Sequence, residues 1–130
     1  MKHMFYNCKE LRELNISNFN KLNVYDMRKM FSDCLSLTHL DLFNFNTGNV
    51  MNMNNIFTSC YQLRALDISN FNTCNVMYVN KMFFHCHSLE ILSDFYFDTK
   101  KVIDMDDLCN YCPGKIITKI IESLSHFKCK

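Results

Sequence analysis

Glycine and proline are scarce in this chain, which has two glycines, one proline and no tryptophan among 130 residues. Chains commonly turn at glycine and proline, so the turns here must rely on Asn, Asp, Ser and Thr instead. No apolar run approaches ~18 residues, so the sequence predicts no transmembrane helix and no membrane insertion. The first residues contain no apolar segment of the kind found in secretory signals.

An excess of one charge sign is also missing, since 14 basic and 13 acidic residues leave a formal net charge of +1. This balance gives no support for a nucleic-acid partner or for binding to a membrane surface. Hydrophobic residues make up 48% of the chain, which argues against disorder. The length of 130 residues fits one folded domain.

What the chain has in abundance is self-similarity with a period of 26 residues. A fixed period of this size indicates stacked structural repeats. The period holds without insertion from Phe5 to Cys112 in several independent columns. Four of these columns are Cys8, Cys34, Cys60, Cys86 and Cys112; Phe5, Phe31, Phe57 and Phe83; Leu14, Leu40, Leu66 and Leu92; and Val24, Val50, Val76 and Val102.

The second unit shows how each repeat is built. Leu37, Leu40 and Leu42 follow the pattern L-x-x-L-x-L, which predicts a strand with alternate side chains pointing inward. Apolar residues within 53–60 are spaced by three, four and seven, which predicts a short helix. We therefore expect an α/β solenoid, a leucine-rich repeat right-handed superhelix with a parallel β-sheet on one face and short helices on the other. The expected core of this unit is Leu37, Leu40, Leu42, Phe45, Val50, Met53, Ile56, Phe57 and Cys60.

Asparagine also recurs with the 26-residue period, and its amides are expected to bond to backbone groups at the turns and so replace glycine. One exception in the core columns is Asp94, which occupies the inward position of Leu42 and Ile68. A buried unpaired carboxylate is costly, so we expect Asp94 either to find a donor or to shift its strand. The asparagines concerned include Asn44 and Asn70, Asn46 and Asn72, and Asn49 and Asn75.

Residues 53–76 resemble the BspA-like leucine-rich repeat, with its pattern Met-x-x-Met-Phe-x-x-Cys-x-x-Leu-x-x-Leu-Asp-Leu/Ile-Ser-Asn-Phe-Asn-Thr-x-Asn-Val. Only Ile56, in place of the second Met, departs from it, and the resemblance covers about residues 1–112. Members of that family are mostly large surface proteins, often adhesins. The resemblance therefore implies a similar solenoid with a binding role at a cell surface, whereas the missing signal and the unpaired cysteines favour a reducing interior.

The two ends of the chain differ. Residues 1–112 are expected to form an array of about four units that starts in mid-repeat, with no polar residues to shield Phe5, Leu11 and Leu14. Self-association through this uncapped edge, or a place within a longer array, would follow. Residues 113–130 begin with Pro113-Gly114 and continue with isoleucines at helical spacing, which predicts an amphipathic helix over 115–127 that caps the solenoid or belongs to a following domain.

Cysteines and histidines can serve either as reactive or metal-binding groups or as ordinary buried and surface residues. The cysteines of the 26-residue column are expected to be buried free thiols. Cys109-x-x-Cys112 with His126-x-x-Cys129 has zinc-ligand spacing, but the repeat already places Cys112 in the core, and we expect no metal or other cofactor. His85 and His87 are expected to face solvent on either side of Cys86. No phosphate loop, paired-carboxylate motif or H-E-x-x-H is present, so we expect no enzyme.

Strand alternation defines the exposed face of the expected sheet, and solenoids commonly bind partners there. Asp41 and Asp67 occupy one column of this face, so one of them should have a raised pKa or the pair should meet a cation, unless both are simply solvated. We expect a protein partner at this face; the alternative is a structural spacer or degenerate repeat fragment with no ligand of its own. The expected binding residues are Glu13, His39, Asp41, Phe43, Asp67, Ser69, Ile91 and Phe95.

Overall fold

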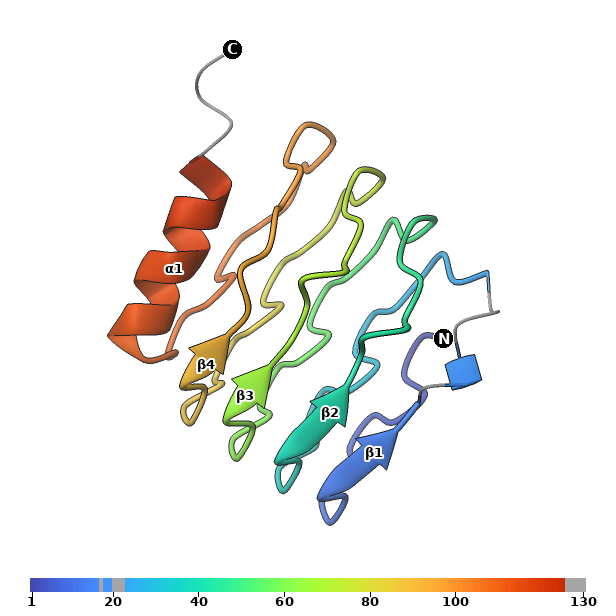
Figure 1. The fold of residues 1–130 in the computed structure, drawn as a ribbon, viewed down its shortest axis with the longest axis vertical. Coiled ribbons are helices and arrows are strands. Elements are labelled where there is room, and N and C mark those ends of the chain that lie inside the picture. Colours follow the sequence, from blue (N-terminus) through green and yellow to red (C-terminus); the bar gives the residue numbers. More distant parts are fainter. Residues whose placement is uncertain (17, 20–22, 126–130) are drawn as a thin grey trace.

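The computed structural model describes residues 1–16, 18–19 and 23–125. Figure 1 shows a row of similar coils of chain that lie side by side, with the helix α1 at one end of the row. Four short strands line one side of the coils, and α1 lies next to the last of them. Their bounds are Glu13–Asn15 for β1, His39–Asp41 for β2, Ala65–Leu66 for β3, Ile91–Leu92 for β4 and Gly114–Ser125 for α1.

Strand pairing keeps the 26-residue period seen in the sequence. β1 pairs with β2 in parallel, with Leu14 opposite Leu40, and β3 pairs with β4 in parallel, with Leu66 opposite Leu92. β2 and β3 are neighbours, but within the described residues they belong to separate two-stranded sheets. Equivalent residues of successive units therefore lie beside one another, which places each repeated side chain next to its own counterpart.

The side of each coil opposite the strands differs from the expected short helix. In the second full coil, a bridge at Asn52 is followed by consecutive turns over 54–59. The N–H groups of Met53, Asn55, Phe57 and Ser59 donate to carbonyls of the next coil at 2.8 to 3.0 Å. Asn55 and Ser59 have positive φ values of 58° and 60°. Bonds to the next coil thus replace the intrahelical bonds, while the same apolar side chains still point inward.

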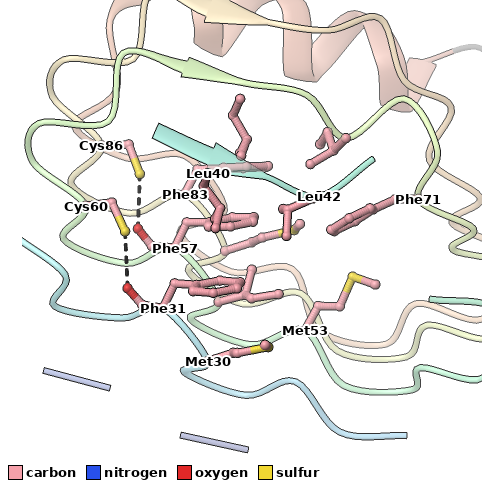
Figure 2. Close-up of a cluster of buried hydrophobic side chains, with 14 of the residues drawn as sticks. Met30, Phe31, Leu40, Leu42, Met53, Phe57, Cys60, Phe71, Phe83 and Cys86 are labelled. Atoms are coloured by element: carbon pink, nitrogen blue, oxygen red, sulfur yellow. Dashed lines mark hydrogen bonds between the residues drawn. The ribbon is translucent and has the colours of Figure 1, made fainter. Parts of the chain in front are cut away.

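The core prediction for the second unit is confirmed, since all nine residues named for it are buried. Phenylalanine rings form a continuous stack through the coils, as Figure 2 shows for Phe31, Phe57 and Phe83. Neighbouring rings in this stack lie 5.7 to 5.8 Å apart between centroids and are nearly parallel. Burial of each such side chain contributes roughly 1.5–3 kcal/mol through the hydrophobic effect.

A hydrogen bond between coils accounts for the thiol that recurs in the cysteine column. Cys34 is buried, and its Sγ–H donates to the carbonyl oxygen of Phe5 in the preceding coil at 3.1 Å. Cys60 and Cys86 repeat this bond to the next phenylalanines at 3.2 Å (Figure 2). Burial raises the pKa of Cys34 to about 11, so the thiol keeps its proton. The prediction of buried free thiols is confirmed for Cys34, Cys60, Cys86 and Cys112, whereas Cys8 is free but only half-buried.

Asparagine side chains form the turns, as the scarcity of glycine suggested. The amide oxygen of Asn46 accepts the N–H of Gly48 at 2.9 Å, which closes a turn within one coil. The amide nitrogens of Asn70 and Asn75 reach back to the carbonyls of Phe43 and Gly48 at 3.0 and 2.9 Å. These bonds join one coil to the preceding one, so the asparagines supply both turn geometry and lateral contact.

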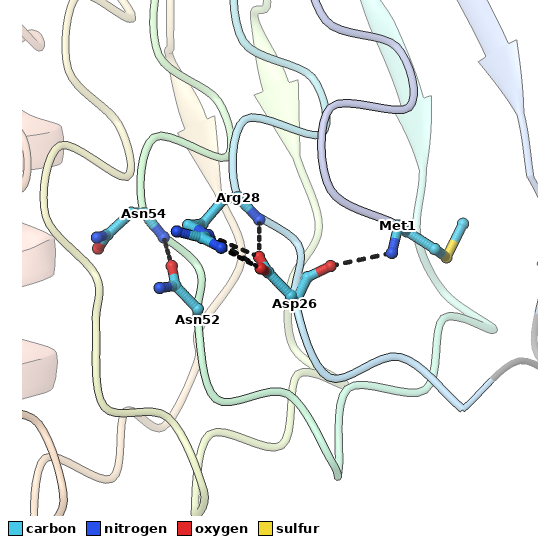
Figure 3. Close-up of polar contacts among 5 residues, drawn as sticks. All are labelled: Met1, Asp26, Arg28, Asn52 and Asn54. Atoms are coloured by element: carbon cyan, nitrogen blue, oxygen red, sulfur yellow. Dashed lines mark hydrogen bonds and ion pairs between the residues drawn. The ribbon is translucent and has the colours of Figure 1, made fainter.

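A second polar column, made of Asp26, Asn52, Tyr78 and Asp104, joins successive coils through single parallel bridges. In Figure 3 the carboxylate of Asp26 accepts the backbone N–H of Arg28 at 2.9 Å and binds its guanidinium at 2.7 Å. Partial burial raises the pKa of Asp26, but the hydrogen bonds and charge of Arg28 outweigh it and hold that pKa below its usual value. Asn52 closes the same turn without a charge.

The two ends of the row are covered to different degrees. Ile116 and Ile120 of α1 are buried against the last coil, whereas Ile121, expected on the same apolar stripe, is 56% exposed. At the other end Phe5 and Leu14 are only half-buried, although their counterparts in the next coil are buried. Phe127, the last expected member of the stripe, lies outside the described residues.

The expectation that the Asp94 side chain points inward is wrong. Its carboxylate is fully exposed, and Oδ1 lies 2.8 Å from Nζ of Lys119 in α1. The alternation of inward and outward side chains changes here. Phe95, at a position expected to face solvent, packs partly against the core, and Phe97 is buried. Asp94 therefore binds a donor at the surface, and the gain in stability expected from replacing it with leucine no longer follows.

Candidate binding face

The outward side of β2, β3 and β4 carries a shallow hollow of about 360 Å³. Leu40 and Leu66 point into the core, so the residues on either side of them in each strand face solvent. The small side chain of Ala65 lies between the larger His39 and Ile91 in the same column, which leaves the space above it open. The lining consists of His39, Leu40, Asp41, Ala65, Leu66, Asp67, Ile91 and Ser93.

Two carboxylates border the hollow, and the following turn holds each of them in place. Oδ1 of Asp41 accepts the N–H of Phe43 at 2.9 Å. Oδ1 of Asp67 accepts the N–H and the hydroxyl of Ser69 at 2.9 and 2.7 Å. The hydroxyl and backbone N–H of Ser69, together with Ser93, hold the pKa of Asp67 below its usual value. The expectation of a raised pKa is therefore wrong for Asp67, which is ionised at neutral pH.

Large apolar side chains lie exposed on and beside this face. Ile91 of β4 lines the hollow and is 65% exposed, and Phe43, just beyond β2, is 63% exposed. Tyr96 is 61% exposed. Phe95 differs from the expectation, because it is half-buried and packs edge-on against Phe97 with 6.3 Å between ring centroids. The face thus combines exposed apolar surface with negative charge.

The structure brings together only some of the residues expected to bind a partner. His39, Asp41, Asp67 and Ile91 line one hollow, whereas Glu13 lies farther along on β1. Ser69 acts by orienting Asp67, and Phe43 is exposed but does not line the hollow. The sequence analysis missed Ala65 and Ser93, although Ala65 was identifiable as the smallest residue in its column.

A second hollow of about 560 Å³ lies between residues 94–96 and α1. Asp94 and Lys119 line it and form the ion pair described above. Glu122 and Ser123 of α1 complete the helix side. This hollow depends on how α1 packs on the last coil, so the repeat pattern alone gave no signal for it.

Comparison with known protein families identifies the family of this chain. The family described as "Mycoplasma protein of unknown function, DUF285" matches residues 1–120. The chain belongs to the DUF285 family. No curated protein and no solved structure matches this DUF285 chain. Within the residues that the structure describes, no helix of the DUF285 chain is long and apolar enough to span a bilayer.

The four residues of the DUF285 chain with zinc-ligand spacing lie only partly within the described residues. The Cys112 thiol donates to the carbonyl of Phe83 at 3.0 Å, as the repeat predicts. Cys109 is half-buried, and its burial raises its pKa to about 11. The other two expected ligands, His126 and Cys129, lie outside the described residues. In the described part of the chain, no group of three or more His, Cys, Asp or Glu side chains is arranged to hold a metal ion.

Proposed function

We propose that this DUF285 chain is a non-enzymatic protein-binding module of the BspA-like leucine-rich repeat type, an α/β solenoid that binds through the outward face of its parallel strands. Support for the repeat type comes from the 26-residue register of the paired strands and from the buried leucines of the L-x-x-L-x-L segments. Support for the binding role comes from the exposed apolar residues on the strand face, because stacked repeats use their extended surfaces for binding.

The observation that carries the proposal is the hollow above Ala65 with its two carboxylates. Asp67 is ionised, and its Oδ1 is fixed by Ser69, so negative charge is held in one place without reorganisation. Ile91 supplies apolar surface beside that charge. This combination suits a lysine or arginine side chain of a partner protein, whose aliphatic stem would lie on Ala65 and Ile91 while its cation faces Asp41 and Asp67.

Selection from a displayed random peptide library against the folded chain tests this function. Peptides with a basic residue next to apolar residues should be enriched. Filling the hollow with Ala65→Met should reduce their binding at least ~10-fold, since a blocked pocket loses its central contact. Gln62→Met is the matched control, because Gln62 is exposed and does not line the hollow. Equal binding by both variants would contradict the proposed site.

The second candidate function is that of a structural spacer without a ligand of its own. The observation that favours it is the half-buried apolar edge at Phe5, Leu11 and Leu14, where a further coil or a second copy of the chain would bury more surface. A spacer enriches no peptide in the selection. It self-associates through that edge, and light scattering at increasing concentration should then show a rising mass that Leu14→Lys suppresses.

A further inference from the structure

Two imidazole rings meet in the last full coil, away from the strand-face hollow. Nδ1 of His85 lies 3.0 Å from Nε2 of His87. A neutral imidazole has one N–H group and one nitrogen lone pair, so one ring can donate its N–H to the lone pair of the other. When the N–H groups of both rings are on their other nitrogens, the two lone pairs instead face a common point where a metal ion can bind.

The fold fixes both rings in this position. The His85 ring is stacked on Tyr111 of the following turn, with 4.4 Å between centroids and 5° between planes. Phe84 meets the same ring edge-on at 4.3 Å. The His87 ring lies 5.4 Å from the ring of Tyr61 in the preceding coil. Contacts from both neighbouring coils therefore hold the nitrogens together before any ligand arrives, which lowers the entropic cost of binding.

The buried cysteine between them explains why the two histidines converge. Cys86 points into the core, where its Sγ–H donates to the carbonyl of Phe57 at 3.2 Å. His85 and His87 are consequently directed away from the core on either side of this anchor, and His85 has the positive φ of 62° that recurs at this position of each coil. The short loop around Cys86 thus holds two ring nitrogens close together on the surface.

The separation fits a divalent transition metal. Zinc binds imidazole nitrogen at about 2.0–2.1 Å, and tetrahedral geometry then requires about 3.3 Å between two ligand nitrogens. The observed 3.0 Å needs an opening of only a few tenths of an ångström. We propose that His85 and His87 together bind a borderline divalent ion of the zinc type, with water in the remaining positions. This site revises the expectation of no metal and does not depend on the proposed protein-binding function.

Zinc itself is the probe for this site. The reduced full chain is titrated with ZnSO₄ by calorimetry, and the histidine ring signals are followed by two-dimensional NMR. One zinc ion per chain is expected, with the largest shifts on the His85 and His87 rings. His87→Ala should weaken binding by more than ~10-fold, because it removes one of two ligands. His87 is exposed, so this change leaves the core intact, and an unchanged melting temperature in the absence of zinc verifies that.

His39→Ala is the matched control, since His39 is an exposed histidine on the strand face. It should bind zinc as the unaltered chain does. Equal zinc affinity of the His87→Ala variant would overturn the proposal, as would ring shifts confined to other histidines. Absence of measurable zinc binding at millimolar concentration would also overturn it and would leave an N–H···N hydrogen bond as the only link between the rings.

Discussion

The two ends of the row of coils use the same repeat but meet solvent differently. At one end α1 buries Ile116 and Ile120 against the last coil, and at the other Phe5 and Leu14 are left half-exposed. The central coils bury the same columns completely. A repeat therefore buries its apolar side chains fully only when both of its sides are covered. The stability lost on truncating one residue type should depend on its place in the row.

Truncation of the phenylalanine stack should show the largest difference along the row. Phe57→Ala removes a fully buried ring with a stacked ring on each side and should lower the free energy of unfolding by about 3–5 kcal/mol. Phe5→Ala should cost less than half as much, because Phe5 is half-buried at the open end. Urea unfolding measures both values. Equal losses would show that the open end is covered in solution.

Truncation within α1 should reveal how much the covered end contributes. Ile120→Ala removes a side chain that is 1% exposed and should cost about 2–4 kcal/mol. The adjacent Ile121 is the control, since its exposed side chain should cost under ~0.5 kcal/mol on truncation. Thermal unfolding of both variants is the measurement. Similar melting temperatures for the two would mean that α1 does not seal the last coil.

Backbone strain should be alike at the two ends, in contrast to burial. Lys29 and Asp107 both have φ values of 54°, a left-handed conformation that residues other than glycine rarely adopt. Glycine at either position should stabilise the chain by about 1 kcal/mol relative to alanine there, because both changes remove the same side-chain contacts. Urea unfolding of the four variants tests this. A gain at only one end would mean that the other turn relaxes when its side chain is removed.

The smallest effect is expected from two surface ion pairs at low pH. Arg28 holds the pKa of Asp26 below its usual value, so this pair stabilises the fold above the unfolded pKa of about 3.8 and loses that contribution as pH falls through the lower folded value. Solvent screening limits it to under ~1 kcal/mol. Asp26→Asn should make the free energy of unfolding slightly less dependent on pH in acid. Asp94→Asn should act in the same direction but less, because Lys119 also lowers the pKa of Asp94 while full exposure screens their attraction. A larger effect of Asp94→Asn would reverse this order.

The repeat period predicted the parts of the fold that depend on one coil lying over the next. Parallel register, buried leucines, free thiols and asparagine turns all follow from equivalent residues meeting at each coil. The segment 53–60 was misassigned, because spacings of three and four describe its buried side whether its N–H groups bond within a helix or to the neighbouring coil.

Features that depend on tertiary placement could not be predicted. Asp94 faces outward because Lys119 of α1 lies within 2.8 Å, and no repeat column contains that lysine. The hollow over Ala65 requires knowledge of how far β3 lies from its neighbours. The meeting of His85 and His87 depends on rings from the adjacent coils, so their spacing in sequence gave only the weak expectation of solvent exposure.

The bonds between coils join residues about 25 positions apart all along the chain, as in Met27 to Asn52 and Val79 to Asp104. Each coil that docks therefore closes a loop of the same length and meets the same entropic cost. The coil next to α1 begins with one side already covered, whereas the coil containing Phe5 gains partners on one side only. We therefore expect folding to spread coil by coil from the coil next to α1 toward the coil containing Phe5. Backbone amides of the coil containing Phe5 should exchange with solvent first.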